Sequence, residues 1–541
     1  MSWLLGLAEC GDLSVVDCAV AAVGLRPLHR CARVRTFFAA GGIPETCVCS
    51  VLDGARPVLE IELGTRLESA HQTVVVRLEA DELTIRNDPL ALRTMYLRKW
   101  QGGLVFSTRL DLLAAVTDPR DLHIDVLGAQ WLTFNRWTSD PMVTDTVALG
   151  QGGSAVYRDG ELTLTNRPWM PGDVREESAS LAEVLRCHAS SPDASLGLSG
   201  GLDSRVLLAL LLGSGARPGL HVFGTDVDPD VRLAKRIAQA HDLDLQHLVE
   251  TLPSVDECLT LVRRHAAESQ VAVPASQALK VHPYDTLHRQ GLMVVDGGFG
   301  EIARRQFLNR LLVRAPRHLC DLNAEGMLPF VTFDRGSLFA PEVAARMRSG
   351  ATEQLARALD DLRDFPADSA EDLADLLCIR TRLPWYFGIE QARMDGHVRS
   401  HMPFATPEAL DRVMRTPLVR RRRGRLMKRL IRTNSPSLAH VPLAKGDLAL
   451  PFSAPREVAW VVARLRVRRS RPTASFRDTF LSHVEPFVRD LVDSREVREC
   501  ALYDAARISD LVRRYYAGER SLGAALDWFL ALELWRQGVR V

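Results

Sequence analysis

The sequence predicts an α+β domain followed by an α/β domain with a parallel sheet and a helical C-terminal part. Residues 1–165 are rich in short β-like runs, such as 74–78 and 104–107, which turn residues separate. In residues 166–541, strand patterns alternate with helix patterns, as in parallel sheets, before helical patterns take over. We therefore expect a domain boundary between residues 165 and 166.

Composition sets the class of protein. At 541 residues the chain is long enough for two or more domains, each with its own core. Its formal net charge of +1 predicts neither a nucleic-acid nor a membrane partner. No apolar run approaches the roughly 18–20 residues that span a bilayer, and the N-terminus lacks the basic start of a signal peptide. Ten cysteines without a Cys-x-x-Cys pair favour a reducing, cytoplasmic location.

The most informative segment is residues 199–204, Ser-Gly-Gly-Leu-Asp-Ser. It lies between an expected strand at 194–198 and an expected buried helix at 206–212. A turn at a helix N-terminus presents backbone N–H groups to an anion, and its glycines allow a phosphate close approach. Asp203 suits Mg²⁺ carried by the phosphates. No Gly-Lys-Ser/Thr ending follows, so this is not a Walker-type loop.

The remaining elements of the α/β part follow in order. The expected strands and helices are 221–224, 231–241, 292–296, 355–362 and 370–377. Asp230 is placed to cap the helix 231–241. Arg205 is expected to contact phosphate or to pair with a surface acid. The basic run 420–432 is either a solvated helix face or a source of side chains for an anion.

The loop resembles the pyrophosphate loop of ATP pyrophosphatases, which cleave ATP between the α and β phosphates. Together with other segments it resembles the asparagine synthetase superfamily, which includes β-lactam synthetases and the macrolactam synthetases of lasso peptides. Residues 87–96 and 103–107 resemble the amidotransferase-like N-domain of that group, and 150–169 resemble its interdomain connection. The resemblance implies an Ntn amidotransferase-like sandwich followed by a sheet of ATP pyrophosphatase type.

The resemblance also implies a nucleotide site. Leu198 and Phe223 fall where backbone groups flank the adenine and ribose, and Asp296 with Gly297 ends a strand near the nucleotide. The implied ATP-binding residues are Leu198, Ser199, Gly200, Gly201, Leu202, Asp203, Ser204, Phe223, Asp296 and Gly297.

The implied catalytic groups include a metal pair. A gapless match puts Ile302 where the family has a second Mg²⁺-binding aspartate, so Glu301 becomes the expected ligand beside Asp203. Lys445 resembles the lysine that neutralises pyrophosphate. Glu390, three residues before an arginine, resembles the acid that helps prepare the attacking amine.

Two departures change the expected chemistry. Class II glutamine amidotransferases use an N-terminal cysteine, whereas this chain has Ser2, and the internal Cys10 has no α-amino group as its base. We therefore expect no glutaminase activity. Phe299 occupies the place of a Glu or Tyr in the family, and a phenyl ring accepts no proton. Three alternatives follow. The general base is another residue, with Glu390 as the first candidate; or the amine arrives already deprotonated; or the transfer chemistry is lost and only nucleotide binding remains.

The resulting hypothesis is an ATP- and Mg²⁺-dependent ligase that adenylates a carboxylate, releases pyrophosphate and forms an amide. Its expected partner is a small molecule or peptide bearing a carboxylate and an amine, and a homodimer or a biosynthetic partner protein is possible. The amide is a β-lactam or macrolactam, asparagine made with ammonia or glutamine, or that of another metabolite or a glycan. Two rivals are a sulfur- or nitrogen-transferring ATP pyrophosphatase and a nucleotide-binding pseudoenzyme.

Overall fold

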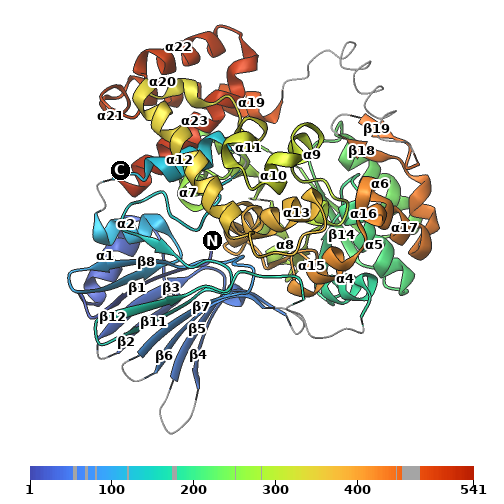
Figure 1. Cartoon of the computed structure of the whole chain (residues 1–541), viewed down its shortest axis with the longest axis horizontal. Coiled ribbons are helices and arrows are strands. Elements are labelled where there is room, and N and C mark those ends of the chain that lie inside the picture. The colour runs from blue at the N-terminus through green and yellow to red at the C-terminus, as the bar shows by residue number, and fades with distance from the viewer. Residues whose placement is uncertain are drawn as a thin grey trace.

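The computed structural model describes most of the chain. It covers residues 1–541 except 34, 53–57, 68–70, 80–81, 119–120, 134, 173–178, 250, 282, 446–447, 454–474 and 541, and for 52, 71, 445 and 448 it describes the backbone alone. Figure 1 shows antiparallel sheets from the N-terminal third on one side of the molecule and a smaller sheet wrapped by helices on the other.

Two six-stranded antiparallel sheets form the N-terminal region, in the orders β10-β8-β9-β1-β3-β2 and β12-β11-β7-β6-β5-β4. Their strands are β1 (Trp3–Ala8), β2 (His29–Arg33), β3 (Thr36–Gly41), β4 (Cys47–Leu52), β5 (Val58–Arg66), β6 (His71–Glu79), β7 (Glu82–Asn87), β8 (Tyr96–Trp100), β9 (Gly103–Ser107), β10 (Val147–Ala148), β11 (Ser154–Arg158) and β12 (Glu161–Thr165). The predicted runs 74–78 and 104–107 lie in β6 and β9.

Strand β1 shows how the two sheets share a core. Leu4 and Ala8 point to one face and pack with side chains of the second sheet, such as Ile61 and Val76. Leu5 and Leu7 point to the opposite face and join a helical core. The region is therefore a sandwich with helices on its outer face, which confirms the α+β expectation in general terms.

A five-stranded parallel sheet follows, in the order β15-β14-β13-β16-β17. Its strands are β13 (Ala194–Gly197), β14 (Gly219–Phe223), β15 (Leu245–Leu248), β16 (Met293–Val295) and β17 (Ser400–His401). The expected strands 194–198, 221–224 and 292–296 are confirmed as β13, β14 and β16. The two other strands were not predicted, and β17 comes from a segment that is otherwise helical. A small hairpin, β18 (Leu443–Lys445) and β19 (Leu448–Leu450), lies near the sheet.

Helices occupy most of the remaining described chain. They are α1 (Leu13–Ala22), α2 (Leu110–Thr117), α3 (Ile124–Leu132), α4 (Leu181–Ala189), α5 (Asp203–Gly213), α6 (Pro229–His241), α7 (Val255–Ser269), α8 (Tyr284–Arg289), α9 (Asn309–Arg314), α10 (Pro316–Cys320), α11 (Ala324–Val331), α12 (Pro341–Asp360), α13 (Ala370–Arg380), α14 (Ile389–Met394), α15 (Pro407–Arg415), α16 (Leu418–Arg421), α17 (Arg425–Asn434), α19 (Phe476–His483), α20 (Glu485–Asp493), α21 (Arg495–Arg498), α22 (Ala505–Tyr516) and α23 (Gly523–Val539). A membrane crossing needs a longer or more apolar helix than any of those described.

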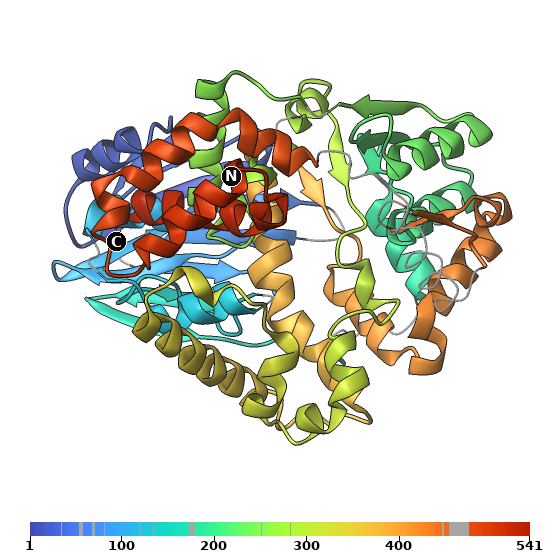
Figure 2. The same ribbon diagram turned by 90° about the horizontal axis from the view of Figure 1, so that it is seen from above.

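The last helices return to the N-terminal sheets. Seen from above in Figure 2, the red C-terminal helices cross over the blue strands. Buried side chains of α23, such as Phe529 and Trp535, belong to the same core as Leu5 and Leu7 of β1. The start and end of the chain are thus packed together, while the parallel sheet keeps its own core around α5.

Candidate active site

The loop 199–202 joins β13, the central strand of the parallel sheet, to the N-terminus of α5. Its shape is held from within: the Ser199 N–H donates to Ser204 Oγ at 3.1 Å, and the Gly201 N–H donates to Ser199 Oγ at 3.2 Å. This edge of a parallel sheet, beside a helix N-terminus, is where open α/β sheets bind anionic ligands.

Asp230 supports this loop, and its predicted capping role is wrong. Helix α6 begins at Pro229 with Asp228 as the N-cap residue. The Asp230 side chain instead accepts a hydrogen bond from the Gly200 N–H at 2.6 Å. Whether Asp230 caps α6 or binds the loop depends on where α6 lies relative to the loop, and the local sequence does not determine that position.

The turn after β16 packs directly on the start of α5. A Cβ atom added to Gly300 would lie 2.7 Å from Asp203 Cγ, and one on Gly297 would lie 2.8 Å from the Ser204 N atom. Glycine is therefore required at both positions for close approach. Asp296 precedes this turn, so the structure brings together the predicted residues Asp203, Asp296 and Gly297.

Arg304 stands between the two predicted metal ligands. Its Nη2 atom lies 2.7 Å from Asp203 Oδ2 and 3.6 Å from Glu301 Oε1. Asp203 Oδ1 is buried and has no hydrogen-bond partner among the described residues. Arg304 was not predicted, although its spacing of three from Glu301 on a helical turn is a signal for an ion pair.

Burial controls the protonation of these carboxyls. It raises the pKa of Asp203 to about 7, with Arg304 opposing the rise and Glu301 and Asp296 adding to it. Burial also raises the pKa of Asp296. Because burial and mutual repulsion make the ionised carboxylates unfavourable, a bound cation would stabilise them.

The carboxylates of Asp203 and Glu301 suit Mg²⁺ as oxygen ligands, but they are too few to hold the ion without oxygen atoms from a substrate. Mg²⁺ prefers oxygen ligands and is commonly held by one or two carboxylates plus substrate phosphates. The unpartnered oxygen of Asp203 and the carboxylate of Glu301 meet that need. In the described part of the chain, no group of three or more His, Cys, Asp or Glu side chains is arranged around a metal position. Ile302 is fully buried in the core.

Strand β18 runs beside the loop and carries Lys445. The Ala444 N–H donates to the Gly200 carbonyl at 2.8 Å, and a Cβ on Gly200 would lie 2.5 Å from Ala444 Cβ. The backbone of Lys445 is thus next to the loop, whereas its side chain lies outside the described atoms.

Arg205 holds the segment that precedes β18: it donates hydrogen bonds to the carbonyls of Val441 and Pro442 at 2.7 and 2.8 Å. Neither expected role of Arg205, phosphate contact or a surface acid, is what the structure shows.

The remaining predicted nucleotide residues lie on neighbouring strands. The Leu198 N–H donates to the His221 carbonyl at 2.8 Å, which ties the end of β13 to β14. Phe223 at the end of β14 packs edge-to-face on Tyr284, with ring centres 4.6 Å apart. Leu202 precedes α5 as its N-cap residue.

Glu390 lies on α14 and forms an ion pair of 2.6 Å with Arg393, the arginine three residues later. Its Oε1 atom is buried and has no hydrogen-bond partner within the described structure. Burial and the charges of Glu390 and Glu301 raise the pKa of Tyr386, which places this phenol within electrostatic reach of both acids. Tyr386, four residues before Glu390, was not predicted, although i,i+4 spacing was the available signal.

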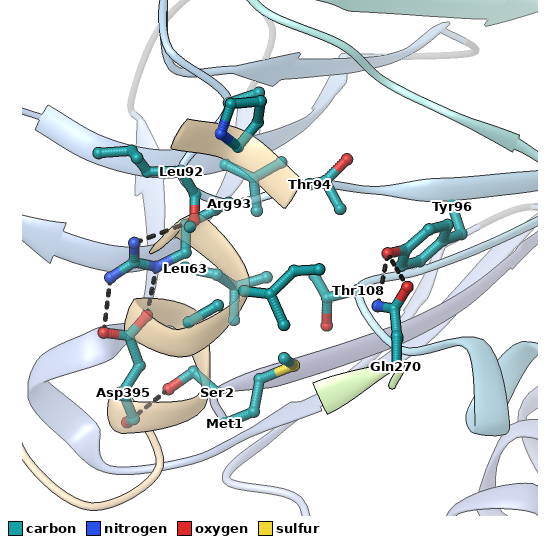
Figure 3. Close-up of a pocket in the computed structure, with 16 residues that line it drawn as sticks. Met1, Ser2, Leu63, Leu92, Arg93, Thr94, Tyr96, Thr108, Gln270 and Asp395 are labelled. Atoms are coloured by element: carbon teal, nitrogen blue, oxygen red, sulfur yellow. Dashed lines mark hydrogen bonds and ion pairs between the residues drawn. The ribbon is translucent and has the colours of Figure 1, made fainter. Parts of the chain in front are cut away.

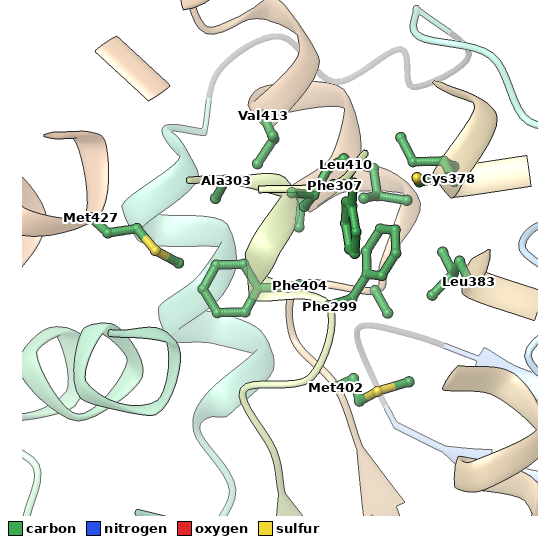
Figure 4. Packing of buried hydrophobic residues seen from close by; sticks show 14 of the residues in the cluster. Phe299, Ala303, Phe307, Cys378, Leu383, Met402, Phe404, Leu410, Val413 and Met427 are labelled. Carbon is green, nitrogen blue, oxygen red and sulfur yellow. The ribbon is translucent and has the colours of Figure 1, made fainter. Parts of the chain in front are cut away.

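Phe299 belongs to the core. Figure 4 shows its ring stacked among buried hydrophobic side chains. Its ring centre lies 5.1 Å from that of Phe307 and 5.2 Å from that of Phe387, and its backbone has a φ of 63°. The side chain therefore packs the turn from behind and offers no proton acceptor.

Position 2, where class II glutamine amidotransferases have their catalytic cysteine, holds a serine. Ser2 is buried and its Oγ bonds Thr46 Oγ1 at 2.5 Å and the Asp395 carbonyl at 3.1 Å. Figure 3 shows it beside a cavity of about 30 Å³, with the Arg93–Asp395 ion pair alongside. Burial raises the pKa of the Cys10 thiol to about 11, which keeps it protonated.

One residue of the basic run 420–432 is neither solvated nor directed at a ligand. Arg421 is fully buried and pairs with Asp375 at 2.6 Å and Asp372 at 3.3 Å. It is part of the helical core below the site.

The comparisons with known proteins give no further guide. No protein-family model matches the chain, and no curated protein matches it.

Proposed function

We propose that the protein is an ATP-dependent ligase that adenylates a carboxylate and joins it to an amine. The observation that carries this proposal is the arrangement at the edge of the parallel sheet: a glycine-containing loop at the N-terminus of α5, the half-paired Asp203 with one buried oxygen, and Glu301 beside it. The parallel sheet would be of the ATP pyrophosphatase type, and the N-terminal sandwich an amidotransferase-like domain without glutaminase activity.

The residues divide the work as follows. The α5 N-terminus would bind phosphate oxygens, and the N–H groups of Ser199, Gly200 and Gly201 would join it by exchanging their internal acceptors for phosphate. Asp203 and Glu301 would hold Mg²⁺, which when bound neutralises phosphate charge. A substrate carboxylate oxygen attacks the α-phosphorus, the bond to the bridging oxygen breaks, and pyrophosphate leaves. Lys445, placed by β18 beside the loop, would balance the charge on that leaving group.

The second half-reaction needs a proton acceptor. The amine nitrogen attacks the acyl carbon, AMP departs with the former carboxylate oxygen, and the amine loses a proton. Glu390 has an unpartnered carboxylate oxygen for this proton, and Tyr386 lies within electrostatic reach of it. The buried Phe299 takes no part.

One observation favours a second candidate, a nucleotide-binding pseudoenzyme. Arg304 already pairs with Asp203, and Asp230 already accepts from the Gly200 N–H. Such internal partners would have to move or share their contacts when nucleotide binds. The orphaned Asp203 oxygen suits a metal-bound nucleotide in either candidate, so pyrophosphate release is the property that separates them.

The experiment is pyrophosphate release from Mg-ATP in the presence of a cell extract that supplies carboxylates and amines. Wild type is compared with Asp203→Asn, which keeps the side-chain shape, and with Asp226→Asn, an exposed carboxylate on the neighbouring loop, as the matched control. We expect release by wild type and the control, and a loss of about 100-fold or more for Asp203→Asn. Equal release by both variants would contradict the proposal, and ATP binding without release by wild type would select the pseudoenzyme.

A further inference from the structure

A cavity of about 370 Å³ opens beside the carboxylates. Glu301 and Arg304 line it. The other walls come from residues 306–308 and the start of α9, from α11, from the end of α13 with the two residues after it, and from the segment after α3 that holds Asn135 and Trp137. Its volume lies within the range of small-molecule sites. Its position means that a ligand inside it would reach the groups proposed to bind the phosphates.

The charge of this cavity is predominantly positive. Arg304, Arg310 and Arg382 line it, against the single carboxylate of Glu301. The Arg382 guanidinium lies 4.3 Å from the centre of the Tyr386 ring, and this stacking orients it. Glu301 is already engaged by Arg304. The cavity therefore favours an anion, and the one carboxylate among the described residues that line it is already paired.

The walls also carry apolar and aromatic surface. Trp137, Phe307 and Phe330 line the cavity together with Leu308 and Leu311. Trp137 is 3% exposed, and its Nε1 atom is buried without a hydrogen-bond partner among the described residues. A side chain of this size and burial gives the cavity a fixed apolar wall.

We propose that this cavity binds the acyl substrate, and that this substrate is a carboxylate with an apolar or aromatic body and no α-ammonium group. The proposal rests on the ligase function above and narrows it. Arg310 and Arg382 would attract and orient the carboxylate, and Phe330 with Trp137 would cover the body. The asparagine synthetase alternative is disfavoured, because aspartate would bring an ammonium group into a cationic cavity with aromatic walls.

The test is calorimetric binding of three probes to the full chain without nucleotide: 4-phenylbutyrate, L-aspartate and 4-phenylbutylamine. We expect 4-phenylbutyrate to bind and the other two to bind at least tenfold more weakly. Arg310→Gln should weaken 4-phenylbutyrate about fivefold to tenfold. Arg314→Gln, on the same helix but away from the cavity, should leave it unchanged.

The apolar wall has its own variant pair. Phe330→Ala should weaken 4-phenylbutyrate about tenfold but leave acetate unchanged, whereas Phe333→Ala, outside this cavity, should change neither. Aspartate or the amine binding as tightly as 4-phenylbutyrate, no binding of 4-phenylbutyrate at millimolar concentration, or wild-type affinity in both Arg310→Gln and Phe330→Ala would overturn the assignment. Probe binding without any pyrophosphate release would instead fault the ligase function. Release with aspartate alone would fault only the substrate class.

Discussion

Asp395 and Asp203 each face an arginine from a distant part of the chain, and the two carboxylates differ in how completely they are paired. Arg93 from the N-terminal region donates to both oxygens of Asp395 through its Nε and Nη2 atoms. Arg304 engages only one oxygen of Asp203 and leaves the other buried without a partner in the described structure. Burial raises the pKa of both carboxyls.

This difference in pairing suggests different roles: the Arg93–Asp395 pair stabilises the fold, and Asp203 is a candidate for binding a ligand. A buried ion pair with every oxygen satisfied joins two parts of the fold, here the N-terminal sandwich and the end of α14, and its loss is costly. A carboxylate with a buried, unpartnered oxygen is costly as it stands and marks a candidate ligand-binding position. The two sites should therefore respond to mutation with opposite signs.

The largest expected effect is at the paired site. Arg93→Ala leaves Asp395 buried without its cation and should lower the free energy of unfolding by about 3–5 kcal/mol. Chemical denaturation measures the loss. ATP affinity of the folded fraction should stay at the wild-type value, and the exposed Arg30→Ala should cost less than about 1 kcal/mol. A stable Arg93→Ala protein with impaired ATP binding would contradict the claim that the Arg93–Asp395 pair serves the fold and not the nucleotide site.

The opposite sign is expected at Asp203. Because its pKa is about 7 in the folded chain and near 4 when unfolded, the folded state binds the extra proton between those values. Stability therefore falls as pH rises from about 4 to 7. Asp203→Asn should remove this loss and gain about 1–3 kcal/mol at pH 7.5, partly offset by the unpaired Arg304, with little gain at pH 4. Denaturation of both proteins at the two pH values measures this, and a destabilised Asp203→Asn at pH 7.5 would count against the account.

A smaller effect is expected at the turn that packs on Asp203. Gly300→Ala puts a methyl group 2.7 Å from Asp203 Cγ, so the carboxylate must shift. ATP affinity should fall about tenfold, which corresponds to about 1.4 kcal/mol. Gly219→Ala, whose added Cβ would meet only the Ala194 carbonyl at 3.9 Å, should bind ATP normally. Equal affinities in the two variants would show that the turn does not position Asp203.

The sequence was sufficient to predict features that depend on local pattern. The strand β13, the loop 199–202 and α5 follow from an apolar run, a glycine-containing turn and a second apolar run. The placement of Asp296 near the loop was implied by the family resemblance, and it agrees with the geometry of parallel strands, whose carboxyl ends meet at one edge of a sheet. The general α+β and α/β pattern is confirmed on the same basis.

Features that depend on distant packing were not predicted. Arg304 meets Asp203 across 101 positions of sequence, and Asp230 supports the loop only because α6 lies against it. Strand β17 has two residues and is too short for a periodic pattern. The cavity beside Glu301 is lined by residues between 135 and 382, so no single segment of the sequence predicts it.

The most direct measurement of the central claim is calorimetric titration of Mg-ATP into wild type, Asp203→Asn and Arg93→Ala. The account predicts that wild type binds Mg-ATP and loses affinity when the metal is chelated. It predicts that Asp203→Asn binds about 100-fold more weakly with little dependence on Mg²⁺, while folded Arg93→Ala binds like wild type. Undiminished, Mg²⁺-dependent binding by Asp203→Asn would contradict the claim that this half-paired carboxylate is the metal ligand of a nucleotide site.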